Sequence, residues 1–189
     1  MTGGDGVMAT QLSFQIEDGG SIPTSPLQFS FEVITAKAAC DLNAKWHSRF
    51  PYIHWSNVVR NKHYICFGLF YENVAYGSAI WSSPIAGNRL KDGWKLLELR
   101  RLALCQECPK NTATWMLSKM EKDIRKRFPD IIKLISYQDT EVHQGTIYKA
   151  ANWVATSKTK AGLSWSDLGR TRNAEQSQAS KVRWERELN

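Results

Sequence analysis

Several features are scarce or missing in this chain of 189 residues, and each absence excludes a class of protein. No apolar run approaches the roughly 18–20 residues that a membrane-spanning helix needs. Residues 1–20 contain no Lys or Arg, so the basic start of a secretory signal is missing. We therefore expect a cytoplasmic protein without a membrane partner.

Cysteine is also scarce, with four residues at positions 40, 66, 105 and 108. Cys105 and Cys108 form one C-x-x-C, and no second pair completes a zinc knuckle. The four histidines form no H-x-x-x-H motif. The residues themselves therefore define no metal site, and the identity of any metal is unknown from them.

Positive charge is absent from the first 35 residues and abundant after them. Those residues carry four acidic side chains and no Lys or Arg, a charge of −4, which leaves +11 on the remainder of a chain whose net charge is +7. Such an excess favours a polyanionic partner, with nucleic acid the first candidate. Many basic proteins bind no nucleic acid, so composition alone leaves the partner open.

The length and a hydrophobic content of 42% fit one globular domain with tails. We predict a mobile acidic leader over residues 1–26 and a folded catalytic domain over residues 27–157. Residues 158–189 are predicted to form a basic C-terminal segment that can add a last strand.

Alternating apolar residues and helix caps predict the order of strands and helices. Strands are predicted at residues 29–33, 63–71, 74–82, 94–104, 131–137, 153–157 and 182–188, and helices at 36–48, 113–127 and 145–151. A two-residue turn after residue 71 predicts an antiparallel hairpin, and the later strand–helix alternation predicts parallel neighbours. The fold class is therefore α/β, with a mixed, partly parallel, twisted sheet flanked by helices.

Four short segments carry a resemblance to a known family: ELRRL at 98–102, PKN at 109–111, ISYQD at 135–139 and GTIYKA at 145–150. A tyrosine-bearing helix runs there into an aromatic-led strand, which is similar to the pattern of GNAT acyltransferases. More narrowly, the segments resemble the phage Mom DNA-modification proteins, a divergent GNAT branch. The resemblance covers roughly residues 60–157.

The resemblance implies modification of adenine in DNA at its exocyclic amino group. The product would carry a carbamoylmethyl-type group that protects phage DNA from restriction in the bacterial host cytoplasm. The implied partner is double-stranded DNA with the target base flipped out of the stack. The donor would be acetyl-CoA or another acyl-type compound, and the resemblance also implies an iron ion.

Two other functions stay open at this point. One is an acyl-CoA-dependent N-acetyltransferase that acts on a small amine, a protein or RNA. The other is a non-enzymatic nucleic-acid-binding protein.

The donor loop departs from the usual GNAT pattern. GNAT loops are rich in glycine, because glycine lets backbone N–H groups close on the pyrophosphate of the donor. Residues 106–113 here contain no Gly. A helix N-terminus still offers N–H groups, so we predict cofactor binding by Arg101, Lys110, Asn111, Thr112 and Ala113.

The candidate catalytic residues lie at predicted helix and strand ends. The resemblance assigns Tyr148 as general acid, with simple packing as the alternative. Asp139 and Ser136 stand at the carboxyl end of a buried strand, where ligands bind in open α/β sheets, although Asp139 also suits a turn. His47 ends the first helix and can act as base, ligate a metal or offset the helix dipole.

Candidates for DNA contact combine aromatic and basic side chains, since a flipped base needs stacking and phosphates need positive charge. Arg101 interrupts an apolar strand beside Arg100, so we expect one of the two to face inward. A buried arginine there must pair with an acid such as Glu98 or reach an anionic group of a substrate. We predict DNA contacts for Trp46, Tyr137, His143, Arg170 and Arg172.

Overall fold

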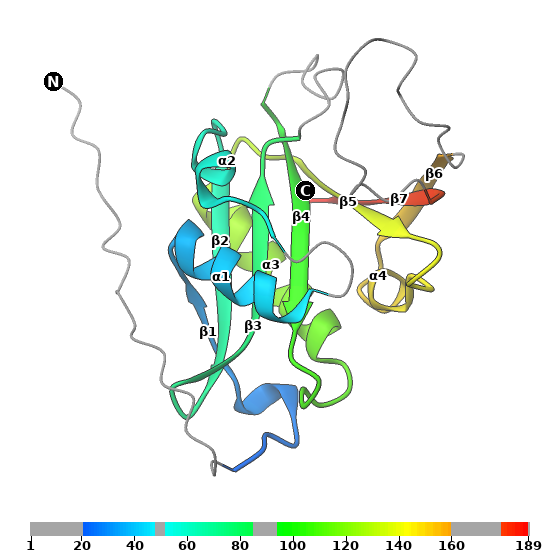
Figure 1. Cartoon of the computed structure of the whole chain (residues 1–189). Helices are drawn as coiled ribbons and strands as arrows, with labels where there is room; N and C mark the ends of the chain where they lie inside the picture. The colour runs from blue at the N-terminus through cyan, green and yellow to red at the C-terminus, as the bar shows by residue number, and fades with distance from the viewer. Residues whose placement is uncertain (1–20, 48–51, 85–93, 160–178, 189) are drawn as a thin grey trace, which may run out of the picture.

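The computed structural model describes residues 21–47, 52–84, 94–159 and 179–188. One seven-stranded sheet runs through the molecule in the order β1-β2-β3-β4-β5-β7-β6 (Figure 1). Its strands are β1 (Ser30–Val33), β2 (Tyr64–Tyr71), β3 (Val74–Ser82), β4 (Leu96–Leu104), β5 (Lys133–Asp139), β6 (Val154–Thr159) and β7 (Lys181–Glu187). The helices are η1, a 3-10 turn (Pro26–Gln28), α1 (Ala36–Trp46), α2 (Trp55–Val59), α3 (Thr112–Arg127) and α4 (Thr146–Ala150).

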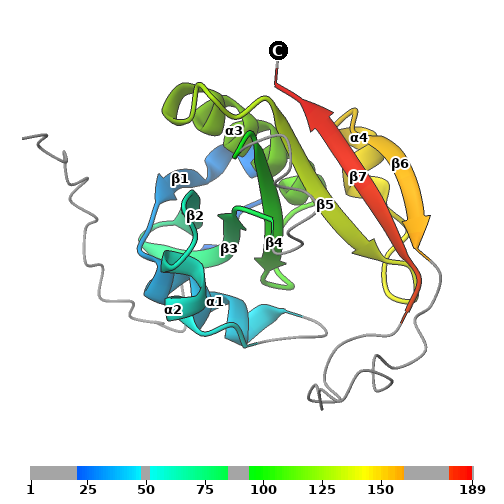
Figure 2. The same cartoon turned by 90° about the horizontal axis from the view of Figure 1, so that it is seen from above.

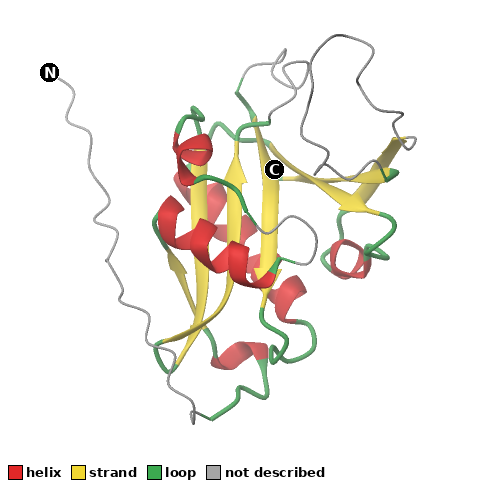
Figure 3. Ribbon diagram, viewed as in Figure 1, coloured by secondary structure: helices red, strands yellow, loops and turns green. Residues whose placement is uncertain are grey.

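Helices cover both faces of this sheet (Figures 2 and 3). On one face α1 and α2 pack over a small core that includes Phe70 and Ile80. On the other face α3 and α4 close a larger core that includes Trp81, Leu97 and Met120. β2 and β3 are therefore buried on both sides, as their nearly continuous apolar sequences require.

The strand pairing confirms the predicted fold class. β4 and β5 run parallel, and every other neighbouring pair is antiparallel, including the predicted β2–β3 hairpin. None of the described helices is long and apolar enough to cross a membrane.

Some element boundaries differ from the expected ones. α1 ends at Trp46 and His47 caps it, two residues before the predicted end. The helix α2 was not predicted, because five residues capped by His54 are too few to show a helical period. β6 runs to Thr159, across the predicted boundary between residues 157 and 158. Residues 1–20 of the mobile leader predicted over residues 1–26 lie outside the described residues, and its last residue, Pro26, begins η1.

The C-terminal strand has an unexpected position in the sheet. β7 lies between β5 and β6 and pairs antiparallel with both. Strand order depends on contacts between distant segments, so the local pattern of residues 182–188 could predict a strand but not its neighbours.

A β-bulge in β4 changes which side chains face which helix layer. Ile80 pairs with Arg101 and Trp81 pairs with Leu99, so Arg100 is an extra residue in β4. The alternation therefore shifts by one position. Leu102 then joins the core under α3, while Arg101 shares the face of its partner Ile80 beneath α1.

The parallel strands β4 and β5 form the feature that positions the site. They pair only from Leu96 to Leu99 on β4 and from Lys133 to Ser136 on β5. Beyond these residues the strands separate as both continue toward their carboxyl ends (Figure 1). Ligands bind at such carboxyl ends in α/β sheets.

Candidate active site

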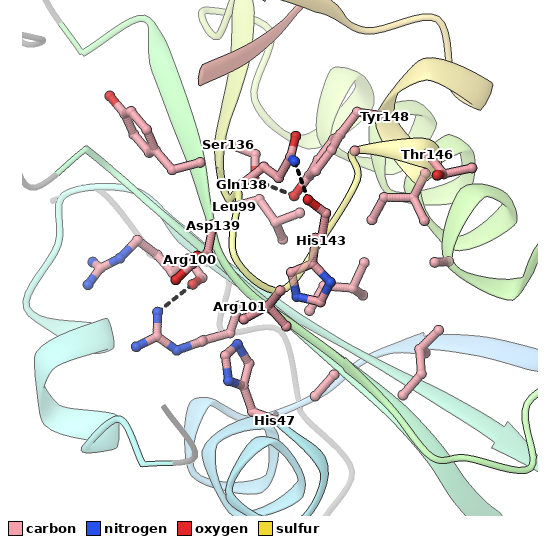
Figure 4. Close-up of a pocket in the computed structure, with 18 of the residues that line it drawn as sticks. His47, Leu99, Arg100, Arg101, Ser136, Gln138, Asp139, His143, Thr146 and Tyr148 are labelled. Carbon is pink, nitrogen blue, oxygen red and sulfur yellow. Dashed lines mark hydrogen bonds between the residues drawn. The ribbon is translucent and has the colours of Figure 1, made fainter. Parts of the chain in front are cut away.

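A cavity of about 480 Å³ occupies the fork between β4 and β5 (Figure 4). Its walls come from residues 99–104 of β4, residues 136–139 of β5 and residues 142–148 of the following loop and α4. The end of α1, the first turn of α3 and the start of β7 contribute Trp46, His47, Ala113 and Lys181. Segments that lie far apart in the sequence, from the end of α1 to the start of β7, thus meet at one opening.

A pair of hydroxyl groups lies on the α4 side of the cavity. The oxygens of Tyr148 and Ser136 are 2.8 Å apart in a buried hydrogen bond. The Tyr148 ring also stacks on Trp184 of β7, with 5.4 Å between ring centroids. Burial raises the pKa of Tyr148. The phenol therefore keeps its proton at neutral pH and can donate it in a hydrogen bond.

Two histidines and an arginine meet on the α1 side. His47 points from the end of α1 toward Arg101 and His143 (Figure 4). Burial, with smaller contributions from the positive charge of Arg101 and from His143, lowers the pKa of His47 to about 4. His47 is therefore neutral at physiological pH and can accept a hydrogen bond.

Arg100 and Arg101 both line the cavity. The expectation that only one of them faces inward is wrong, because the bulge breaks the alternation on which it depended. Arg100 donates to the Ser82 hydroxyl at 3.2 Å, and its Nε lies 3.7 Å from a carboxylate oxygen of Glu98. Arg101 donates from Nη1 to the Arg100 carbonyl at 2.7 Å. Burial lowers the pKa of both guanidinium groups, but from so high a value that both stay charged.

Asp139, Tyr137 and His143 also line the cavity, at the end of β5 and in the loop after it. The Asp139 carboxylate accepts from the Glu141 backbone N–H at 3.0 Å. The His143 backbone N–H donates to the Asp139 carbonyl at 3.0 Å. Asp139 thus forms the turn proposed as its alternative role and at the same time borders the cavity.

The predicted cofactor residues at the start of α3 divide into two groups. Ala113 lines the cavity, whereas Lys110 and Asn111 are exposed and, with Thr112, do not line it. The Thr112 hydroxyl instead donates to the Pro109 carbonyl at 2.7 Å. Asn111 has φ +69°, so it takes the left-handed conformation that glycine usually supplies.

This arrangement fits the phosphate arm of an acyl donor such as acetyl-CoA. The first backbone N–H groups of a helix have no carbonyl partner within the helix, and their positive end attracts phosphate. Those of α3 stand beside the cavity at Ala113. They would hold the phosphates, while the fork between β4 and β5 would hold the reactive end.

The iron ion that the resemblance implies fits this cavity less well than an acyl donor does. Among the residues that the structure describes, no three His, Cys, Asp or Glu side chains gather as a metal site. No step below depends on a metal.

The remaining predicted residues have different outcomes. Trp46 lines the cavity and carries the ammonium of Lys45 at 5.0 Å over its ring. Arg170 and Arg172 lie outside the described residues. Sequence reasoning missed Gln138 and Lys181 as cavity residues. Gln138 stands between Tyr137 and Asp139, which were chosen, and on alternation it shares the face of Ser136, which was chosen as well.

The sheet order, the fork between two parallel strands and the tyrosine on the following helix define the GNAT fold. The ribosomal-protein-S18-alanine N-acetyltransferase of Escherichia coli matches with a TM-score of 0.59 at 10% identity, over 85% of this chain and 94% of that chain. A GNAT family acetyltransferase from Elizabethkingia anophelis with acetyl-CoA bound matches with a TM-score of 0.59 at 12% identity, over 85% and 98%. The spermidine/spermine N-acetyltransferase of Vibrio cholerae, in complex with manganese ions, matches with a TM-score of 0.57 at 9% identity, over 86% of this chain and 94% of that chain.

Within this fold class the chain belongs to the Mom protein family, whose model matches residues 28–187. The resemblance inferred from the short segments is thereby confirmed. The match extends well beyond residues 60–157 and includes β7. A search of curated proteins found no matching relative.

Proposed function

We propose that this protein transfers a carbamoylmethyl-type group to the exocyclic amine of adenine in DNA and thereby protects phage DNA from restriction. The observation that carries this proposal is the cavity at the fork in a chain of the Mom family. The cavity combines a protonated phenol at Tyr148 with a carboxylate at Asp139 and two arginines. Group transfer to a weak amine is helped by an acid and a base, the roles proposed here for Tyr148 and Asp139.

The adenine amine is a poor nucleophile, because its lone pair is delocalised into the ring. In the proposed reaction its nitrogen forms a bond to the electrophilic carbon of the donor, and the bond from that carbon to the leaving group breaks. Tyr148 donates its phenolic proton to the leaving group, and the Asp139 carboxylate accepts the proton that the amine loses. Neutral His47 and the Ser136 hydroxyl supply further hydrogen bonds.

Double-stranded DNA is the proposed partner, held through its phosphates by the basic part of the chain. Flipping the target base costs a few kcal/mol, which stacking and hydrogen bonds in the cavity must offset. Trp46 and Tyr137 are the proposed stacking residues. Arg100, Arg101 and Lys181 supply positive charge at the same opening.

Expression in a bacterium followed by mass spectrometry of the DNA nucleosides tests this function, because the mass of the adduct identifies the transferred group. Tyr148→Phe and Asp139→Asn should each lower the adduct about 100-fold or more, the size of a lost acid or base. Matched controls are Tyr64→Phe and Asp41→Asn, which make the same changes at exposed positions that do not line the cavity. Both controls should keep full activity.

A normal adenosine profile in cells that express the folded protein well would contradict the proposal. Stabilisation by acetyl-CoA without a DNA adduct would favour an N-acetyltransferase for a small amine, a protein or RNA. Salt-dependent DNA binding unaffected by Tyr148→Phe, again without an adduct, would favour a non-enzymatic nucleic-acid-binding protein.

A further inference from the structure

The side chain of Gln138 links the two sides of the cavity. Gln138 lies on β5 and is 6% exposed. Its Nε2 donates to the backbone carbonyl of His143, and its Oε1 accepts from the indole N–H of Trp184 at 2.8 Å. Trp184 stacks on Tyr148. One amide therefore contacts both the loop that carries His143 and the ring that supports Tyr148.

The chemistry of the two partners fixes the orientation of this amide. An indole N–H can only donate and a backbone carbonyl can only accept, so the amide oxygen must face Trp184 and the nitrogen must face His143. Space around the amide is also limited. A Cβ atom at Gly145 would lie 2.5 Å from Gln138 Oε1 and 2.6 Å from the Trp184 ring. The loop therefore passes directly over Gln138.

We propose that Gln138 is a positioning residue, which holds the His143 loop and the Trp184–Tyr148 stack in one fixed relation across the cavity. In this role its side chain acts through its two hydrogen-bond partners, the His143 carbonyl and the Trp184 indole. The effect of Gln138 on the reaction rests on the proposed function. The hydrogen bonds themselves can be tested without any activity.

The substitution Gln138→Glu provides a titratable replacement. In this variant the protonated carboxyl group keeps both bonds, since its O–H donates to the His143 carbonyl and its other oxygen accepts from Trp184. The ionised carboxylate keeps the Trp184 bond but sets a negative oxygen against the carbonyl. Burial and that carbonyl should raise the pKa of the introduced carboxyl group above its ordinary value of about 4.3.

Nuclear magnetic resonance can follow the His143 carbonyl directly. His143–Gln144 is the one place in the sequence where Gln follows His. Protein labelled with carbonyl-¹³C His and ¹⁵N Gln therefore gives a single carbonyl–amide cross-peak. The peak should move in Gln138→Met. In Gln138→Glu it should match the wild-type position at pH 5 and approach the Gln138→Met position by pH 8.

Adduct formation in cells gives the second measurement, normalised to folded protein. Gln138→Met should lower the adduct at least tenfold. The matched control is Glu121→Gln, the reverse swap at another buried acceptor of an indole N–H, that of Trp153. Because Glu121 does not line the cavity, the control should stay within twofold of wild type and leave the cross-peak unmoved.

The outcomes separate this inference from the proposed function. If wild type forms no adduct, the proposed function fails and the cross-peak alone decides the role of Gln138. An unmoved cross-peak in folded Gln138→Met, or a full adduct level in that variant, overturns the positioning role. If Gln138→Met does not fold, the titration of Gln138→Glu decides, and a pH-independent difference from wild type counts against the inference.

Discussion

Acidification should destabilise the protein through His47, and replacement of this residue should remove the effect. Burial of His47 beneath the cavity, with the positive charge of Arg101 next in size and His143 after it, lowers its pKa from 6.5 to about 4. The folded protein therefore favours the neutral ring. The unfolded chain has the ordinary pKa, and so it binds a proton at a higher pH than the folded protein does.

The size of the effect follows from the difference between the two pKa values. At about 1.4 kcal/mol per pKa unit the full shift corresponds to about 3 kcal/mol, and partial solvent exposure of His47 reduces this to about 2 kcal/mol. This stability is fully present above pH 6.5, declines as the pH falls from 6.5 to about 4, and is then constant. About 1 kcal/mol of it should be lost by pH 5.

Urea unfolding at pH 7.5 and pH 5.0 measures this loss in wild type and in His47→Gln, which keeps a polar side chain without the titration. The free energy of unfolding of wild type should fall by about 1 kcal/mol more than that of the variant. Equal falls in the two proteins would refute the reasoning. A histidine ring resonance that disappears in His47→Gln should titrate well below pH 6.5, and a midpoint near 6.5 would refute the reasoning independently.

Three further perturbations test other parts of the structure. Gly145→Ala should lower the free energy of unfolding by about 2–4 kcal/mol, because residue 145 has φ +73° and a Cβ atom there would clash with the Gln138 side chain. A loss below about 1 kcal/mol in urea unfolding would contradict this expectation. The hydrogen bond from Cys108 lowers the pKa of Cys105, whereas burial raises the pKa of Cys66. Iodoacetamide should therefore modify Cys105 before Cys66. Peptide mass mapping gives the order, and modification of Cys66 first opposes the prediction. Deletion of Arg100 removes the extra residue of the bulge and leaves Arg101 opposite Ile80 and Leu102 opposite Ala79, so the α3 core keeps its side chains while the cavity loses one guanidinium group. The adduct should fall about tenfold or more, and an unchanged adduct level would show that Arg100 has no role in the reaction.

Local sequence signals predicted most of the elements, since each depends on residues close together in the chain. The hairpin of β2 and β3 follows from two β-rich segments around a two-residue turn, Glu72 and Asn73, which both have positive φ. α3 follows from its helical period and from the proline after it. The Tyr148 helix was found by resemblance to the GNAT pattern.

Other features depend on which segments meet, and no local pattern contains that information. The bulge at Arg100 is defined by its register against β3, and it alone brings both arginines to the cavity. The hydrogen bond from Trp184 to Gln138 joins β7 to β5 across 46 positions of sequence. Asn111 takes the left-handed conformation for which the donor loop has no glycine, and the residue type alone did not predict this conformation.

The sequence by itself determined the family, the mixed sheet and the chemistry-bearing side chains, because apolar alternation and short motifs are local properties. It also determined an uneven charge, with all of the excess positive charge after residue 35. Only the tertiary structure decided that β4 and β5 separate beyond Leu99 and Ser136, and that His47, Arg101, Asp139 and Tyr148 border one cavity there. The physical reason is that strand pairing, twist and packing between distant segments fix where side chains meet.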